Sequence, residues 1–226
     1  MNFTMCITDR LKQLDPTLVE HNEGHWDKPL NLEMPGFSSF NDAGIECETG
    51  EFLYSMVRLL KPKRILETGT HWGVGASYMG LGLLDNNDGG LLDTIEFIPE
   101  IHARAKQRIE TIGLRGLVYC HLGDVAAFPT DNKYSLILLD TEPQTRFAEL
   151  LKFYQCLEPG GFIFIHDLNR HMHQIPNEEH GFAWPYGPIP QGMTDLVKLG
   201  HLRPFHFSTP RGLTGFYKVS PEDYKW

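Results

Sequence analysis

The chain has 226 residues, of which 41% are hydrophobic and 22% charged, and its formal net charge is −9 at pH 7. This length suffices for one sizeable hydrophobic core and is short for two full domains. The sequence holds no apolar run of about 18 residues, so we expect no membrane-spanning helix and no membrane partner. The acidic balance also disfavours nucleic acid as a partner, because negative charge repels a phosphate backbone.

The N-terminal sequence and the cysteines bear on cellular location. The first residues, MNFTMCITDRLKQLD, lack the basic and apolar regions of a secretory signal peptide. The four cysteines, Cys6, Cys47, Cys120 and Cys156, form no CxxC pair, which favours reduced thiols over disulfides or a zinc site. We therefore expect a cytoplasmic protein.

The first part of the chain differs from the rest in its pattern of hydrophobic residues. Residues 1–40 carry weak hydrophobic periodicity and several Pro and Gly residues, which predicts an irregular N-terminal arm. From Glu48, apolar residues recur at helical spacing until Pro62 ends the helix. We therefore expect an arm or lid over residues 1–47 and a single domain over residues 48–226.

From residue 64 onward, predicted strands and helices alternate. Alternation of this kind predicts parallel βαβ units with right-handed crossovers. The expected fold class is α/β, a doubly wound, mostly parallel seven-stranded sheet with an antiparallel terminal strand. We expect strands over residues 64–67, 91–96, 117–120, 134–140, 162–165, 204–208 and 213–219, with helices after the glycine-rich turn 69–75 and over 99–111 and 145–157.

Acidic side chains mark the carboxyl ends of four predicted strands, at Glu67, Glu96, Asp140 and the pair His166-Asp167. Ligands of doubly wound sheets bind outside the carboxyl ends of the strands. Carboxylates near a core are costly unless they have partners. The pattern therefore predicts a binding site at this edge of the sheet.

The segment ETGTHWG, residues 67–73, follows a predicted strand and opens a helix. Gly69 permits a tight turn, and Gly73 lets the backbone come close to a ligand. The free N–H groups at the start of the helix can hold a carboxylate, and Glu67 can face a positive group of the same ligand. The alternative is that Glu67 only caps the helix.

These motifs, in this order, resemble those of class I S-adenosylmethionine-dependent methyltransferases. The likeness is greatest to small-molecule O-methyltransferases of the catechol and macrocin groups, and it covers residues 45–170. It implies transfer of a methyl group from S-adenosylmethionine to a hydroxyl of a small molecule of natural-product, sugar or phenolic type. It also leaves a homodimer open, because members of this group are often dimeric.

The resemblance implies a set of cofactor-binding residues. The segment LLDTIEFIPE, residues 91–100, is similar to the strand whose terminal acid binds the ribose hydroxyls, and HLGDVAAF, residues 121–128, to the segment that lines the adenine. The implied cofactor-binding residues are Glu67, Gly69, Thr70, Gly73, Glu96, Phe97, Asp124, Val125 and Asp140.

Other functions stay open at this point. One is a non-catalytic module that binds S-adenosylmethionine. Another is a nicotinamide-dependent oxidoreductase, but its G-x-G-x-x-G fingerprint is absent, since bulky Trp72 stands between Gly69 and Gly73 and no glycine follows Gly69 at the second place. Methyl transfer to nitrogen or carbon is a further alternative.

Two acids at neighbouring strand ends, Asp140 and Asp167, are candidate metal ligands. In metal-dependent members of the resembled group, acids at these places bind the metal, and oxygen ligands suit Mg²⁺, Mn²⁺ or Ca²⁺. We expect His166 or Asn169 to complete such a site. At the position of Asp167 those enzymes often carry Asp-Asn or Glu-Asp, whereas residues 166–169 of this chain are His-Asp-Leu-Asn. The alternative is that Asp140 only braces the cofactor pocket and Asp167 caps a loop.

Removing the proton of the acceptor hydroxyl requires a base. The catalytic candidates are Asp140, His166 and His171, since an unperturbed imidazole titrates near pH 6.5. The lysine that serves as base in the catechol enzymes has no counterpart near Gln144. Each histidine can instead be a surface or packing residue.

The stretch GFAWPYGPIPQG, residues 181–192, is too rich in Pro and Gly for a helix and predicts a loop. Its aromatic residues Phe182, Trp184 and Tyr186 are expected either to close over an acceptor or to cover the sheet. The segment Met34–Phe37 is a second candidate lid.

Overall fold

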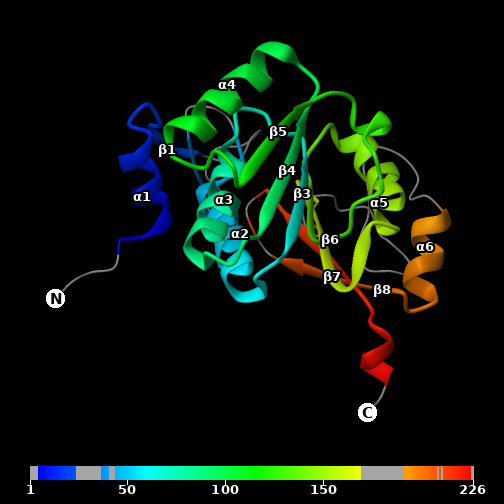
Figure 1. Cartoon of the computed structure of the whole chain (residues 1–226). Helices are drawn as coiled ribbons and strands as arrows, with labels where there is room; N and C mark the ends of the chain where they lie inside the picture. Colours follow the sequence, from blue (N-terminus) through cyan, green and yellow to red (C-terminus); the bar gives the residue numbers. More distant parts are fainter. Residues whose placement is uncertain are drawn as a thin grey trace.

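The computed structural model describes residues 5–23, 37–40, 44–168, 191–207, 209 and 211–224. Its centre is a seven-stranded sheet (Figure 1). Strand β9 runs antiparallel to both of its neighbours, and the pairs on the other side of β7 are all parallel. In spatial order the strands are β5 (Val118–Leu122), β4 (Leu91–Glu96), β3 (Arg64–Thr68), β6 (Tyr134–Leu139), β7 (Leu157–His166), β9 (Leu213–Lys218) and β8 (Leu202–Phe207).

Helices cover both faces of this sheet (Figure 1). Helices α2 (Cys47–Leu60), α3 (Val74–Asn86) and α4 (Pro99–Thr111) pack on one face. Helices α5 (Arg146–Tyr154) and α6 (Gln191–Lys198) pack on the other. The predicted α/β class, the doubly wound sheet and its antiparallel strand are confirmed. Short 3-10 helices are η1 (Val125–Ala127), η2 (Pro143–Thr145) and η3 (Pro221–Tyr224).

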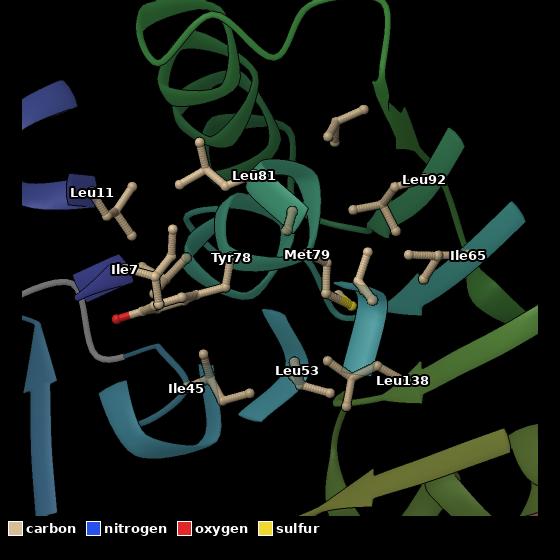
Figure 2. Close-up of a cluster of buried hydrophobic side chains, with 14 of the residues drawn as sticks. Ile7, Leu11, Ile45, Leu53, Ile65, Tyr78, Met79, Leu81, Leu92 and Leu138 are labelled. Atoms are coloured by element: carbon tan, nitrogen blue, oxygen red, sulfur yellow. The ribbon is translucent and has the colours of Figure 1, made fainter. Parts of the chain in front are cut away.

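Successive residues of the central strands face opposite layers of the core. Leu136 and Leu138 of β6 join the cluster under α2 and α3, whereas Ile137 and Leu139 join the cluster under α5. The alternation follows from the two-residue period of a strand, and burial on both faces explains why β6 is continuously apolar from Leu136 to Leu139. Figure 2 shows the first of these clusters, with Leu138 on the strand side.

The N-terminal segment is more regular than the sequence predicted. It contains helix α1 (Ile7–Leu14) and an antiparallel pair of strands, β1 (Glu20–Glu23) and β2 (Phe37–Phe40). Ile7 and Leu11 lie beside Tyr78 of α3 in the core (Figure 2). The expectation of an irregular arm was wrong for these residues, because two helical turns give too short an apolar pattern to stand out. The role of residues 1–47 as a lid remains a prediction.

Two later elements also differ from expectation. Strand β7 starts at Leu157 and includes Pro159-Gly160-Gly161, which the sequence suggested would end a helix before a shorter strand. The pairing of β7 with β6 shifts register between Tyr134 and Leu136 of β6. This bulge or irregularity in the ladder accommodates the Pro-Gly-Gly segment of β7. Helix α6 begins inside the predicted loop 181–192, whose first ten residues lie outside the described part of the chain. No described helix combines the length and hydropathy needed to cross a membrane.

Candidate functional site

A cavity of about 160 Å³ lies at the carboxyl ends of β3 and β6, the edge at which the sequence predicted a site. Two elements separated in the sequence form its walls, the start of α3 and the segment before α2. Charged side chains of both signs face it. Its lining includes Ile45, Glu67, Thr70, Asp140, Arg146, Asp167 and Arg211.

The glycine-rich turn is tied to the neighbouring strands by backbone contacts. Gly69 has φ +79°, and a Cβ on it would collide with the carbonyl oxygen of Asp140, so only glycine fits here. The amide groups of Gly69 and Thr70 donate to the carbonyl oxygen of Ile95, over 3.0 and 3.1 Å. Gly73, with φ +82°, precedes the first residue of α3. The turn is therefore held against both β4 and β6 while its helix start faces the cavity.

Glu67 is a buried carboxyl group at the end of β3. Its Oε2 accepts a hydrogen bond of 2.5 Å from the Thr94 hydroxyl, which lies 2.5 Å from the Thr70 hydroxyl. Burial raises the pKa of Glu67 to about 8, and the negative charges of Asp140 and Glu96 act in the same direction. A buried acid of this kind is ready to face a cation brought by a ligand.

Glu96, at the end of β4, is fixed by backbone amides. Its Oε2 accepts from the amide of His71 at 2.8 Å, and its Oε1 accepts from the amides of Phe97 and Ile98 at 2.9 Å each. Glu96 is thereby joined to the glycine-rich turn, although it does not line the cavity. The Phe97 side chain beside it is 70% exposed.

The predicted adenine-lining residues lie further along the same edge. Asp124 is exposed and accepts a hydrogen bond from the amide of Ala126 at 2.8 Å, which starts η1. Val125 is half-buried. Neither residue lines the cavity. The structure therefore gathers Glu67, Gly69, Thr70 and Asp140 around the cavity and leaves the predicted adenine residues on the adjoining surface.

His166 is buried between two carboxylates. Its Nδ1 lies 2.9 Å from Asp140 Oδ1, and its Nε2 lies 2.5 Å from Glu46 Oε2. Burial alone would lower the pKa of His166, but the nearby carboxylates of Asp140, Asp167 and Glu46 outweigh it and raise that pKa to about 10. A ring that donates from both nitrogens has no lone pair for another proton, so this geometry does not favour His166 as the base.

Two arginines that the sequence did not single out lie in the same cluster. Arg146 Nη2 is 3.2 Å from Asp140 Oδ1 and 3.3 Å from Asp167 Oδ2. Arg211 faces both oxygens of Asp167, with Nη2 at 3.0 Å from Oδ2 and Nε at 2.8 Å from Oδ1. Burial alone would raise the pKa of Asp167, but the positive charges of His166, Arg211 and Arg146 hold it below its usual value.

The predicted metal ligands do come together. Asp140, His166 and Asp167 each offer one ligand atom within 4.8 Å of the others. The chemistry of this donor set does not fit a divalent cation, because the guanidinium groups of Arg146 and Arg211 already contact the carboxylates of Asp140 and Asp167. The rule that ligands bind at the carboxyl ends of parallel strands located the two acids, but no sequence pattern indicated the two arginines. Asn169 and His171 lie outside the described residues.

His71 is a further cavity residue that the sequence analysis passed over. It has φ 48°, and its ring stacks on Trp72 with 4.9 Å between ring centroids. The Arg104 guanidinium lies 3.9 Å from the centroid of the Trp72 ring. Trp72 therefore packs against Arg104 of α4, while His71 lines the cavity and stacks on Trp72.

Comparison with protein families identifies the segment that carries this site. Residues 66–168 match the family model Methyltransf_24, described as a methyltransferase domain. The matched segment runs from β3 to the end of β7 and is a little under half of the chain. It contains the glycine-rich turn, Glu96, Asp140 and Asp167. The resemblance to methyltransferases drawn from the sequence is confirmed.

Relatives among curated proteins carry the name "Putative O-methyltransferase". One from Mycobacterium sp. (strain JLS) is 30% identical over 122 residues, which are 52% of this chain and 54% of the relative. Another from Mycobacterium avium (strain 104) is 31% identical over 122 residues, or 52% of this chain and 53% of the relative. The chain thus spans about half the length of the curated relatives it matches.

Solved structures share the fold. The O-methyltransferase TomG from Streptomyces achromogenes, in complex with S-adenosylmethionine, has a TM-score of 0.60 at 18% identity, over 80% of this chain and 83% of that chain. The methyltransferase PaMTH1 from Podospora anserina, bound to S-adenosylhomocysteine, has a TM-score of 0.62 at 17% identity, over 97% and 98%. The seven-stranded architecture is therefore that of known methyltransferases.

Proposed function

We propose that this protein, whose residues 66–168 match a methyltransferase domain, transfers a methyl group from S-adenosylmethionine to a hydroxyl of a small molecule. The observation that carries the proposal is the buried Glu67 beside the glycine-rich turn, at the edge of the sheet where this architecture binds ligands. Relatives named as O-methyltransferases favour oxygen as the acceptor atom.

The residues around the cavity fit such a cofactor. Glu67 carries a buried carboxyl group with a raised pKa, and the methionyl ammonium would supply the positive charge that this group needs to ionise. The N–H groups at the start of α3 suit the methionyl carboxylate. Glu96 would hold the ribose hydroxyls, and the exposed ring of Phe97, with Asp124 and Val125, would border the adenine. When bound, the cofactor supplies a methyl group on a positively charged sulfur.

The acceptor proton needs a carboxylate that faces the cavity. Asp140 lines it, and His166 and Arg146 hold its Oδ1 in place. In our proposal Asp140 accepts the hydrogen bond of the acceptor hydroxyl and would take its proton as the O–CH3 bond forms and the S–CH3 bond breaks, with S-adenosylhomocysteine as the leaving group. His166 then acts as a positioning residue. His171 remains a predicted base, and the Gly-Pro-rich segment 181–190 remains a predicted lid.

Calorimetric titration with S-adenosylmethionine and S-adenosylhomocysteine tests the proposal. We expect Glu67→Gln and Glu96→Ala each to weaken binding at least about tenfold, because hydrogen bonds to charged groups contribute about 1.5–3 kcal/mol. Glu100→Gln, an exposed acid of α4, is the matched control and should bind like the parent. No affinity of the parent protein for either ligand would end the proposal.

A screen of hydroxylated acceptors with radiolabelled cofactor then separates the remaining functions. Transfer of label to a phenol, sugar or other hydroxylated small molecule is the expected result. Tight cofactor binding without transfer to any acceptor would instead indicate a non-catalytic binding module. Binding of NAD in place of S-adenosylmethionine would indicate an oxidoreductase.

A further inference from the structure

We propose that Arg146 and Arg211 stand where a divalent cation would bridge Asp140 and Asp167, so that this protein works without a metal at that place. The catalytic part of this inference rests on the proposed function. Its other part is the exclusion of divalent cations. That exclusion depends only on the side chains around Asp140 and Asp167, so it can be measured separately.

Arg146 is held in a bridging position by the backbone of both strand ends. It is the first residue of α5, and its side chain is 3% exposed. Its Nε and Nη2 donate to the carbonyl oxygen of Thr141, just after β6, at 2.8 and 2.6 Å. Its Nη1 donates to the carbonyl oxygen of His166 at the end of β7. These bonds leave Nη2 between Asp140 and Asp167, where a bridging metal ion would have to lie.

Arg211 closes the other side of Asp167. Its guanidinium faces both carboxylate oxygens, and its Nη1 donates to the carbonyl oxygen of Gly44 at 3.1 Å. Its backbone amide donates to Glu46 Oε1 at 3.2 Å. Arg211 therefore connects three stretches of chain that are far apart in the sequence. A metal ion could reach Asp167 only by displacing these bonds.

Two guanidinium groups already stand against the carboxylates of Asp140 and Asp167. Arg146 contacts both acids, and Arg211 contacts Asp167. Arginine stays charged at all physiological pH values, so it cannot yield its place by losing a proton. Adding a divalent cation at this place would bring it against the guanidinium groups of Arg146 and Arg211, and this repulsion between like charges opposes binding.

The same contacts orient the acid that faces the cavity. Asp140 receives hydrogen bonds at Oδ1 from Arg146 and His166, and among the described residues no hydrogen bond reaches its Oδ2. One carboxylate oxygen is thus anchored, and the other is available to an acceptor. In metal-assisted enzymes a cation positions the acceptor oxygen, whereas in our proposal Arg146 and His166 position the Asp140 carboxylate that would bind it.

Manganese titration followed by electron paramagnetic resonance tests the exclusion of metal directly. We expect the parent protein to bind no stoichiometric Mn²⁺ at millimolar concentration. We also expect its melting temperature to be unchanged by Mg²⁺, Mn²⁺, Ca²⁺ or a chelator. One Mn²⁺ per chain that is lost in Asp167→Asn would overturn the inference.

The converse experiment removes one guanidinium. Arg211→Gln exposes the oxygens of Asp167, so Mn²⁺ should bind this variant at least about tenfold better than the parent and raise its melting temperature. Arg203→Gln, an exposed arginine of β8, is the control and should show no such response. If Arg211→Gln does not fold, Arg146→Gln provides the same comparison. A folded variant with no gain in Mn²⁺ binding contradicts the inference.

Kinetic measurements distinguish the proposal of methyl transfer from the proposal of metal independence. Once an acceptor is found, exhaustive chelation should leave the rate of methyl transfer unchanged within about twofold. A chelated protein that loses activity and regains it with Mg²⁺ would refute metal independence while leaving methyl transfer established. If no acceptor is ever methylated, the Mn²⁺ titrations still decide whether the arginines exclude the cation.

Discussion

Glu67 shows how a single residue can couple the fold to its ligand. Glu67 is 2% exposed, its carboxyl group accepts a hydrogen bond from the Thr94 hydroxyl, and the negative charges of Asp140 and Glu96 act on it. The sequence identified this residue because an acid directly after a buried strand and before a glycine turn is unusual. The sequence could not show the raised pKa, since that depends on the distance to Asp140 and Glu96 in the folded chain.

The stability of the cofactor-free protein should depend on pH through Glu67. Its pKa is 4.5 in an unfolded chain and about 8 when folded, so its contribution to stability is complete below pH 4.5 and is lost as the pH rises through about 8. We expect the free energy of unfolding to fall by about 1.4 kcal/mol per pH unit over this interval from this residue. Urea denaturation of Glu67→Gln should lack that component, whereas Glu100→Gln should retain it. Equal slopes in Glu67→Gln and the parent would contradict the prediction.

Cofactor binding should release a proton from the same carboxyl group. At pH 7 a carboxyl group with a pKa of about 8 is mostly protonated, and a bound ammonium group favours its ionised form. Calorimetric titrations in two buffers of different ionisation enthalpy should therefore report release of up to about one proton. The release should vanish in Glu67→Gln. Binding without any buffer dependence in the parent protein would count against this role.

At the scale of elements, helix α1 is linked to the glycine-rich turn through one buried ion pair. Asp15, just after α1, lies 2.8 Å from Arg108 of α4, with side chains 7% and 5% exposed. Arg108 Nη1 also donates to the carbonyl oxygen of Trp72 at 2.7 Å, inside the glycine-rich turn. The N-terminal segment therefore supports the turn from behind, which no local pattern in the sequence indicated.

Replacing Asp15 by Asn should destabilise the chain by about 3–5 kcal/mol, because the Arg108 charge would stay buried without its carboxylate. The same variant should bind S-adenosylmethionine more weakly, because the carbonyl oxygen of Trp72 loses its fixed donor. Urea denaturation and calorimetry measure the two effects. Asp9→Asn, whose ion pair with Lys12 lies at the surface, should leave the free energy of unfolding nearly unchanged. Equal effects of the two substitutions would refute the argument.

The elements were predictable to different degrees for physical reasons. Buried parallel strands such as β6 are mostly apolar, so the sequence located this strand within one or two residues. Helix α1 and the pair β1–β2 are short, and their apolar residues are too few to form a clear period. The early start of β7 was missed because a bulge admits the Pro-Gly-Gly segment that a regular strand would exclude.

At the scale of the whole molecule, the sheet brings distant residues to one edge. The rule that ligands bind at the carboxyl ends of parallel strands located Glu67, Asp140 and Asp167. It could not locate Arg146 or Arg211, since these follow no motif and depend on how α5 and the turn before β9 return to that edge. The cavity could be predicted from the sequence, whereas the balance of charge inside it required the folded chain.

A ligand held at this edge should stabilise the whole chain. At one hundred times its dissociation constant, S-adenosylhomocysteine should raise the free energy of unfolding by about 2.7 kcal/mol, provided that it binds only the folded state. Thermal denaturation at several ligand concentrations measures this effect. The rise should be smaller in Glu96→Ala at the same concentration. A melting temperature independent of ligand in the parent protein would show that the cavity does not bind this molecule.

The strand order β7-β9-β8 sets a sequence of events during synthesis. Strand β8 leaves the ribosome before β9 but pairs only with β9, so it has no place in the sheet until its successor emerges. Arg211 lies in the turn between these two strands. We therefore expect Asp167 to gain its contact with this guanidinium only after β9 has been synthesised and has joined the sheet.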